Sequence, residues 1–172
     1  CVRYSEPLAN HCTYAIGGPA TALIEPASIP QLQLLRRLII AETVPWTVIG
    51  SGSNLLCPDT GFQGVVIKIG SNLGKLTICD NEIFVEAGYS AARLATRAAL
   101  RGLDGLSHIV GIPGTIGGLI AMNGGSNRQT ISDYLVEIES MDHHGQLKVR
   151  PSSRCRFSYR SSRFQGTTEI IV

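Results

Sequence analysis

A strand that runs into a glycine-rich turn is encoded by residues 48–56, which are Val48-Ile49-Gly50-Ser51-Gly52-Ser53-Asn54-Leu55-Leu56. The apolar run at residues 45–49 predicts a short buried strand. Gly50 and Gly52 can adopt backbone angles closed to other residues, and successive amides in such a turn point into one concavity that suits a phosphate or diphosphate. Additional side-chain donors would come from Ser51, Ser53 and Asn54.

This pattern alone has a simpler alternative. It is not a GxGxxG motif, because Asn54-Leu55 stand where a third glycine would come, and it is not a P-loop, because no Gly-Lys-Ser/Thr follows. For the isolated stretch, a surface turn between two strands is the favoured interpretation.

A second glycine segment changes that weighting. Residues 111–125 hold six glycines in fifteen residues, and almost everything between them is apolar. A flexible linker would be polar, whereas glycine in buried backbone marks a place where a ligand or another backbone comes close. The two glycine segments together predict an extended ligand that touches both, with its phosphates at the first.

The composition is that of an ordinary folded domain. The 172 residues are enough for one domain or two small lobes, and 44% hydrophobic with 16% charged residues predicts a real core. The net charge is +2 and Arg36-Arg37 is the only adjacent basic pair, so no nucleic-acid partner is expected. No apolar run is long enough to span a bilayer, and the N-terminal residues lack a signal-peptide pattern.

Neither a disulfide framework nor a metal site is expected. The five cysteines, at positions 1, 12, 57, 79 and 155, are odd in number and show no CxxC spacing, so reduced thiols in a cytosolic protein are predicted. His143-His144 precede Gly145 without a carboxylate or cysteine partner at ligand spacing, which favours hairpin residues over metal ligands.

The remaining pattern predicts a mixed α/β chain. The opening segment up to residue 20 is expected to be irregular. Helices are expected at residues 29–42, where Ser28 would act as the cap, at residues 91–101 after Ser90, and around residues 115–122. Strands are expected at residues 21–26, 45–49, 64–69, 75–79, 83–87, 134–141, 147–149 and 168–172.

Four stretches occur in the order found in one known family. They are Thr13-Tyr14-Ala15-Ile16-Gly17-Gly18-Pro19-Ala20, residues 49–56, Gly111-Ile112-Pro113-Gly114-Thr115-Ile116-Gly117-Gly118 with Met122-Asn123, and Phe157-Ser158-Tyr159-Arg160-Ser161-Ser162-Arg163-Phe164. In these stretches the chain resembles the UDP-N-acetylenolpyruvoylglucosamine reductases, also called UDP-N-acetylmuramate dehydrogenases. The broader group is the flavoproteins with a vanillyl-alcohol-oxidase-type FAD domain.

The resemblance implies an α/β (α+β) FAD-binding domain of two lobes with the cofactor between them. The lobes would be residues 1–70 and 71–172, the second truncated at its C-terminal end. The resemblance places the FAD diphosphate at the first glycine segment and the flavin near the second. The expected FAD contacts are Ile49, Gly50, Ser51, Gly52, Ser53, Asn54, Leu55, Gly111, Pro113, Gly114, Thr115, Gly117, Gly118 and Asn123.

The resemblance also implies the reaction. NADPH would reduce FAD, and hydride would then pass to the enolpyruvyl group of a UDP-sugar in peptidoglycan precursor synthesis, a cytoplasmic step that supports cell wall biogenesis, cell shape and cell division. Negative charge builds on the carboxylate side of that group, and Arg160 in the Tyr-Arg-x-Ser motif matches the family's active-site arginine. Tyr159 would contact substrate or flavin. For the pair outside a family match, a surface strand is the alternative.

Two departures from the family pattern stand out. Ala15 occupies a position that is usually basic. The family's proton-donor serine and final glutamate belong to a substrate-binding domain that would follow residue 172. This chain is therefore expected to bind FAD without completing the reduction. It is also expected to be a monomer.

The alternatives are another flavoprotein of the superfamily, for which Cys57 is the only nearby candidate for covalent attachment, and a non-catalytic remnant domain that binds a partner.

Overall fold

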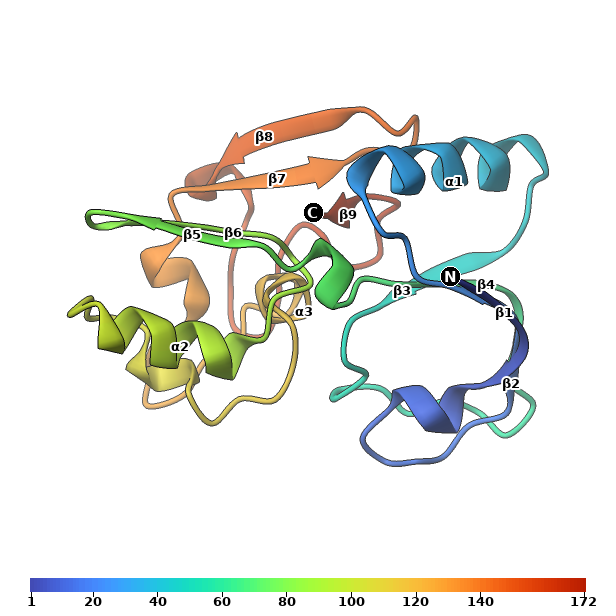
Figure 1. Ribbon diagram of the computed structural model, residues 1–172, viewed down its shortest axis with the longest axis horizontal. Coiled ribbons are helices and arrows are strands. Elements are labelled where there is room, and N and C mark those ends of the chain that lie inside the picture. The colour runs from blue at the N-terminus through green and yellow to red at the C-terminus, as the bar shows by residue number, and fades with distance from the viewer.

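The computed structural model describes all residues from 1 to 172 (Figure 1). The strands and α-helices, in chain order, are β1 Val2–Pro7, β2 Pro19–Ile24, α1 Ile29–Ala41, β3 Trp46–Ile49, β4 Phe62–Lys68, β5 Leu76–Cys79, β6 Glu82–Val85, α2 Ala91–Leu100, α3 Ile116–Ala121, β7 Glu137–Met141, β8 Leu147–Pro151 and β9 Ile170–Ile171. Short 3-10 helices lie at Leu8–His11, Ser71–Leu73, Ser107–Ile109, Ile131–Tyr134 and Ser152–Arg154. This mixed content confirms the predicted α+β class.

The first sheet is built from the first 68 residues, in the order β1-β2-β4-β3. β1 is antiparallel to β2, and β4 runs parallel to both β2 and β3. The expectation of an irregular opening segment is therefore wrong for residues 2–11, whereas residues 12–18 form no helix or strand. Residues 2–7 carry little apolar alternation, and they become a strand because β2 offers a free edge with which they pair.

Helices α1 and α2 begin at the capping residues that the sequence predicted. The hydroxyl of Ser28 accepts a hydrogen bond from the Gln31 amide at the start of α1, and Ser90 caps α2 in the same way. Gly102, with φ +72°, follows the end of α2. These caps satisfy amides that have no partner inside the helix.

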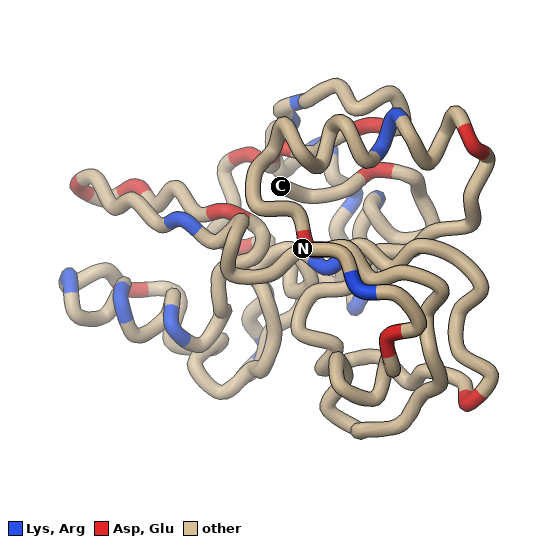
Figure 2. Tube along the Cα trace, turned by 45° about the vertical axis from the view of Figure 1, so that its right-hand side comes forward, with Lys and Arg blue, Asp and Glu red and all other residues tan.

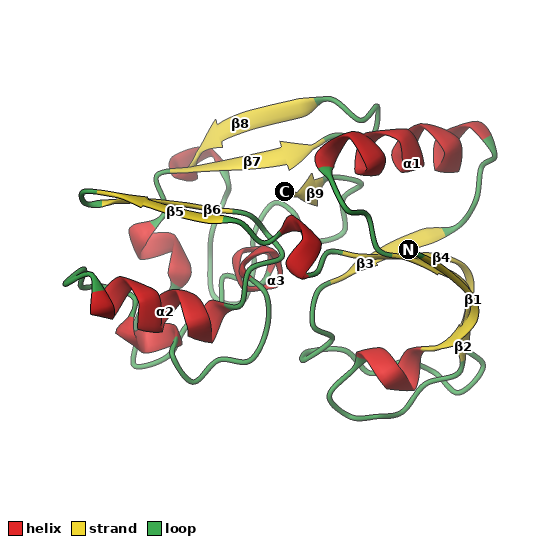
Figure 3. Ribbon diagram, viewed as in Figure 1, coloured by secondary structure: helices red, strands yellow, loops and turns green.

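The second half of the chain holds a hairpin and a small sheet (Figure 3). β5 and β6 form the expected hairpin, and Asp80 takes a left-handed conformation in its turn. β7 pairs antiparallel with both β8 and β9. The strand predicted from residue 134 starts later, at Glu137, because residues 131–134 form a 3-10 helix whose first turn is closed by a capping box of Thr130 and Asp133.

One hydrophobic cluster joins the two halves. It includes Leu32 of α1, Ile67 of β4, Leu94 of α2, Ile116 of α3 and Ile170 of β9, each at most 3% exposed. A smaller cluster fills the other face of the first sheet. The predicted division at residue 70 stays a prediction, and the main core runs across it.

A buried arginine also connects the halves. Arg36 of α1 is 1% exposed, and its guanidinium stacks 3.9 Å from the centre of the Trp46 ring. Its Nη2 donates to the Thr168 carbonyl at 3.2 Å. Burial lowers the pKa of this guanidinium from its ordinary value. α1 is thus fastened both to the first sheet and to the segment that leads into β9.

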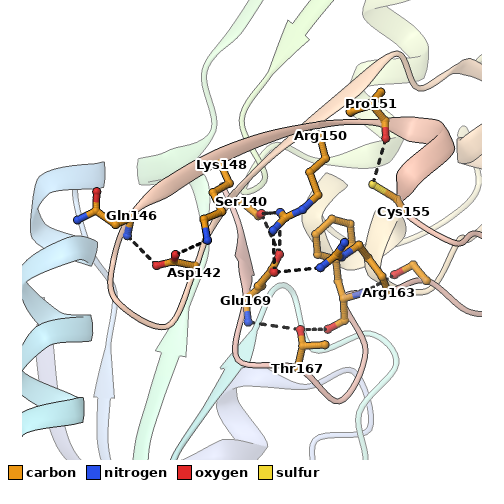
Figure 4. A network of polar contacts seen from close by, with 12 residues as sticks. Ser140, Asp142, Gln146, Lys148, Arg150, Pro151, Cys155, Arg163, Thr167 and Glu169 are labelled. Carbon is orange, nitrogen blue, oxygen red and sulfur yellow. Dashed lines mark hydrogen bonds and ion pairs between the residues drawn. The ribbon is translucent and has the colours of Figure 1, made fainter.

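A polar network holds the last sheet together (Figure 4). Glu169 accepts from Arg150 at 2.9 Å and from Arg163 at 3.3 Å, and the Ser140 hydroxyl lies 3.1 Å from the same carboxylate. Asp142 pairs with Lys148 at 2.8 Å. Elsewhere, acidic and basic residues are spread over both halves of the molecule (Figure 2).

Candidate functional site

The first glycine segment leaves the sheet directly after β3. Ile49 is buried and pairs with Lys68 in the register of β3 and β4. Residues 50–54 then lie outside any helix or strand, and their backbone amides donate no hydrogen bond within the chain. Amides without a partner are rare in folded proteins, especially at a buried residue such as Gly52. The turn therefore offers a row of donors to a ligand.

Several glycines here are required by the chain itself. A Cβ on Gly50 would collide with the Thr115 hydroxyl, and one on Gly52, whose φ is +67°, would collide with the His11 carbonyl. A Cβ on Gly117 would lie 2.9 Å from that of Ala87. At these three positions the space is filled by protein. The amides of Gly50 and Gly52 remain available to a ligand, whereas the Gly117 amide already donates to the Ala87 carbonyl at 2.8 Å.

The structure brings the two glycine segments together. The Ser53 hydroxyl donates to the Pro113 carbonyl at 2.9 Å. Thr115 caps α3, and Figure 3 shows that helix between the first sheet and α2. Gly111 is exposed and a Cβ there would meet nothing within 4 Å. Open backbone therefore lies on the second segment next to the unpaired amides of the first.

Hydrogen bonds connect the motif at residues 157–164 to the end of the second glycine segment. The Asn123 amide donates to the Ser158 carbonyl at 2.9 Å and accepts from the Ser132 amide at 3.3 Å. The Ser162 hydroxyl donates to the Ala121 carbonyl at 2.7 Å. Asn123, at 4% exposed, thus joins two chain segments.

Tyr159 and Arg160 stand in solvent at this junction. Tyr159 is 89% exposed, and the guanidinium carbon of Arg160 lies 5.9 Å from its ring centre. The Arg160 backbone has φ +52°, and its carbonyl accepts from Gln165, whose amide also contacts Met122. Arg160 forms no ion pair within the chain. The Arg160 guanidinium is consequently free to meet an anion.

A chain of three polar side chains lies under the first glycine turn, and sequence analysis did not single it out. His11 is 8% exposed and lies 2.8 Å from Glu6 through Nε2 and 3.1 Å from the Lys68 ammonium through Nδ1. The hydrogen bond from His11 is the main reason why the pKa of Glu6 lies below its ordinary value. These residues are 57 positions apart at their widest contact, so no local signal marks them.

The two cysteines nearest the turn are neighbours. Burial raises the pKa of the Cys57 thiol, and the Cys12 thiol beside it raises it further. The Cys12 thiol donates to the Ile16 carbonyl at 3.1 Å. All five cysteines are free, and no group of three or more metal-ligating side chains is present. None of the helices has the length and apolar character needed to cross a membrane.

Comparison with known proteins agrees with this geometry. Residues 20–149 match the family model of the FAD binding domain. The chain is 45% identical over 171 residues to a UDP-N-acetylenolpyruvoylglucosamine reductase of Bacillus pumilus and 43% identical over 172 residues to one of Carboxydothermus hydrogenoformans. It spans 99% of its own length in both alignments, and 56% and 57% of those proteins.

A solved structure shows the same fold. The UDP-N-acetylenolpyruvylglucosamine reductase of Thermus caldophilus superposes with a TM-score of 0.80 at 30% identity, over 99% of this chain and 59% of that one. The unpaired amides of residues 50–54 fit a ligand that carries a diphosphate, and the backbone at Gly111 is open to such a ligand. The chain therefore belongs to the FAD-binding domain family.

Proposed function

We propose that this chain is the FAD-binding portion of a UDP-N-acetylenolpyruvoylglucosamine reductase. The substrate would be the enolpyruvyl ether of UDP-N-acetylglucosamine, the product UDP-N-acetylmuramate and the electron donor NADPH. The names of the relatives support this choice, since similarity to them extends over 99% of the chain. The structural observation that carries it is the row of unpaired amides at residues 50–54, tied to the second glycine segment by Ser53 and Pro113.

The chain's own residues would bind the cofactor in two places. Amides of residues 50–54 would hold the diphosphate, because unpaired donors in a glycine turn favour an anion. Gly111, Gly114 and Gly118 would lie along the rest of the molecule. Asn123 would keep its present role of fastening the second segment to residue 158. Bound FAD would supply the hydride chemistry that no side chain can perform.

Arg160 would act on the substrate. Its guanidinium carries no internal ion pair, and the Gln165 side chain links the Arg160 carbonyl to Met122, the residue after α3. A fixed cation beside the enolpyruvyl carboxylate stabilises the charge that develops there more than it stabilises the ground state. Tyr159, which is almost fully exposed, would form part of the surface that meets the substrate or the flavin.

The cellular setting follows from the proposed reaction. A reductase of a UDP-sugar precursor would work in the cytoplasm, in peptidoglycan synthesis and hence in cell wall biogenesis, cell shape and cell division. We propose a monomer with small-molecule partners only, without nucleic acid or membrane contacts.

The decisive experiment has two steps. The purified chain is titrated with FAD, and binding is followed by quenching of flavin fluorescence. The complex is then titrated with the UDP-sugar enolpyruvate, and the flavin absorption bands are recorded. We expect saturable FAD binding and a substrate-dependent change in the bands. A protein that ignores FAD would refute the proposal, and a spectral response to the UDP-sugar would show that residues of this chain contact the substrate.

The same preparation tests the alternatives. Acid precipitation that leaves flavin bound to the protein would favour an oxidase with covalent FAD, for which the half-buried Cys57 is the candidate thiol named from the sequence. A non-catalytic remnant would show no flavin binding at all. The donor preference is checked by adding NADPH or NADH to the anaerobic complex and comparing the rates of flavin bleaching.

A further inference from the structure

The polar chain from Glu6 through His11 to Lys68 has no role in the site as described so far. It connects the end of β1, the 3-10 helix that follows β1 and the end of β4. The 3-10 helix and the end of β4 border the first glycine turn. The His11 carbonyl touches Gly52, the Thr13 amide donates to the Gly52 carbonyl at 3.2 Å, and Lys68 pairs with Ile49.

The hydrogen bonds fix the protonation state of His11. A carboxylate only accepts and an ammonium only donates. The imidazole must therefore donate from Nε2 to Glu6 and accept at Nδ1 from Lys68. It can do both only as the neutral tautomer with its proton on Nε2. The carboxylate holds the ring, and the ring in turn orients the ammonium.

The positive charge of Lys68 is not neutralised within the chain. Its side chain lies on the face of β4 shared with Val66, which belongs to the small cluster that also contains Ile49. It is only partly exposed and forms no ion pair with any carboxylate, since its one polar contact is the neutral ring of His11. An ammonium donates three hydrogen bonds, and two of these remain unused within the chain.

We propose that Lys68 is an anion-binding residue of the cofactor site, held by His11 and Glu6 so that its ammonium faces the diphosphate gripped by the glycine turn. This inference rests on the proposed function. A partly buried cation with a neutral positioning partner fits a ligand that brings its own negative charge, because a carboxylate partner would already neutralise it. Glu6 keeps its distance from Lys68, since the imidazole stands between them.

The test compares FAD binding by four variants of the intact chain. Lys68→Met removes the charge and keeps the length, and Lys68→Arg keeps the charge. Lys75→Met is the matched control, because Lys75 is exposed and its side chain makes no polar contact within the chain. His11→Leu removes the positioning ring. We expect Lys68→Met to raise the Kd for FAD about 10- to 100-fold, the range for one charge-assisted hydrogen bond, and Lys75→Met to leave it within about twofold.

Two further readouts separate binding from folding. ADP, which carries the diphosphate without the flavin, should displace FAD from the unsubstituted chain and lose affinity by the same factor in Lys68→Met. Nitrogen NMR of His11 should show an unprotonated Nδ1 and a protonated Nε2 before any cofactor is added.

The two remaining variants test charge and positioning. Lys68→Arg should retain most of the affinity for FAD, and His11→Leu should lose affinity for FAD although Lys68 is still present.

The possible contrary results distinguish a failure of this inference from a failure of the proposed function. Equal affinities for Lys68→Met and Lys75→Met, with FAD bound normally by the unsubstituted chain, would overturn this inference and leave the proposed function standing. A loss seen for FAD and not for ADP, or a His11 ring protonated on Nδ1, would also overturn it. Failure of the unsubstituted chain to bind FAD would overturn both.

Discussion

The Ser53 hydroxyl donates a hydrogen bond to the Pro113 carbonyl at 2.9 Å, across a separation of 60 residues. This contact is where the turn after β3 meets the segment that leads into α3. Two stretches that each look like an unremarkable loop thereby become one surface, with unpaired amides on one side and open backbone on the other.

Removal of the Ser53 hydroxyl should loosen this junction. We expect Ser53→Ala to lower the free energy of unfolding by about 0.5–1.5 kcal/mol, because a neutral hydrogen bond is lost. It should also weaken FAD binding, since the two segments are no longer held in register. Urea unfolding and fluorescence titration measure the two effects. Ser51→Ala is the control for stability: Ser51 lies in the same turn, and its hydroxyl makes no hydrogen bond within the chain. Equal free energies of unfolding for the two variants would contradict the prediction.

Gly50 and Gly111 should respond differently to alanine. A methyl group on Gly50 meets the Thr115 hydroxyl, so Gly50→Ala should cost about 1–3 kcal/mol of stability. Gly111→Ala should change stability by less than about 1 kcal/mol, because nothing lies within 4 Å and φ is outside the left-handed range. If the cofactor lies along Gly111, the same variant should still raise the Kd for FAD. A destabilised Gly111→Ala protein would show that the space is not open.

Gly52 combines two constraints, and a paired variant separates them. Gly52→Ala must place a side chain at φ +67° and against the His11 carbonyl, so we expect a loss of about 2 kcal/mol or more in chemical unfolding. Gly166→Ala has nearly the same φ, +66°, with nothing within 4 Å, and measures the conformational strain alone. A bulky residue at position 52 is therefore a test of folding before it is a test of cofactor binding. Equal losses in the two variants would remove the steric argument.

Asp142 should make the protein sensitive to acid. The Lys148 side chain, followed by the backbone amides of Gln146 and His144, holds the pKa of this carboxyl well below its ordinary value of 3.8. A depressed native pKa means that the unfolded chain takes up the proton first, so stability is present above pH 4 and is lost as the pH falls below it. Asp142→Asn should flatten the fall in unfolding free energy between about pH 5 and pH 2. Lys148→Met should flatten it only in part, because the amide donors remain. An unchanged acid limb in Asp142→Asn would contradict the assignment.

Arg160 should matter to the substrate and not to the cofactor. We expect Arg160→Met to weaken the spectral response to the UDP-sugar enolpyruvate by about 10-fold or more, with little change in the Kd for FAD. Arg156→Met is a close control, because Arg156 is also exposed and has φ +50°, against +52° for Arg160. Parallel titrations of the two variants decide the matter. A response to substrate that survives in Arg160→Met would argue against the proposed role.

Local signals explain what the sequence revealed about the fold. Ser28 and Ser90 were recognisable as helix caps, and each accepts a hydrogen bond from the amide three residues later. The structure adds Thr115 as the cap of α3. The glycines of both segments were visible as positions where backbone is approached closely. Structure adds that protein itself fills the space beside Gly50 and Gly52, which no pattern of spacing distinguishes from an approach by ligand.

Long-range pairing explains what the sequence did not reveal. β1 became a strand only because β2 was available as a neighbour. The contact of His11 with Lys68 joins the 3-10 helix after β1 to the end of β4, and nothing in the local sequence of either residue marks it. Side chains that act through distant partners of this kind come into view only after the chain is folded.

The main hydrophobic cluster draws side chains from α1, β4, α2, α3 and β9 into one interior. The proposed cofactor site draws on both halves of this body, so the shared interior sets how its two glycine segments lie relative to each other. Chimaeras that exchange residues 1–70 between relatives should consequently lose folding stability through poor core packing. They should keep it when the core residues of the other half are exchanged as well.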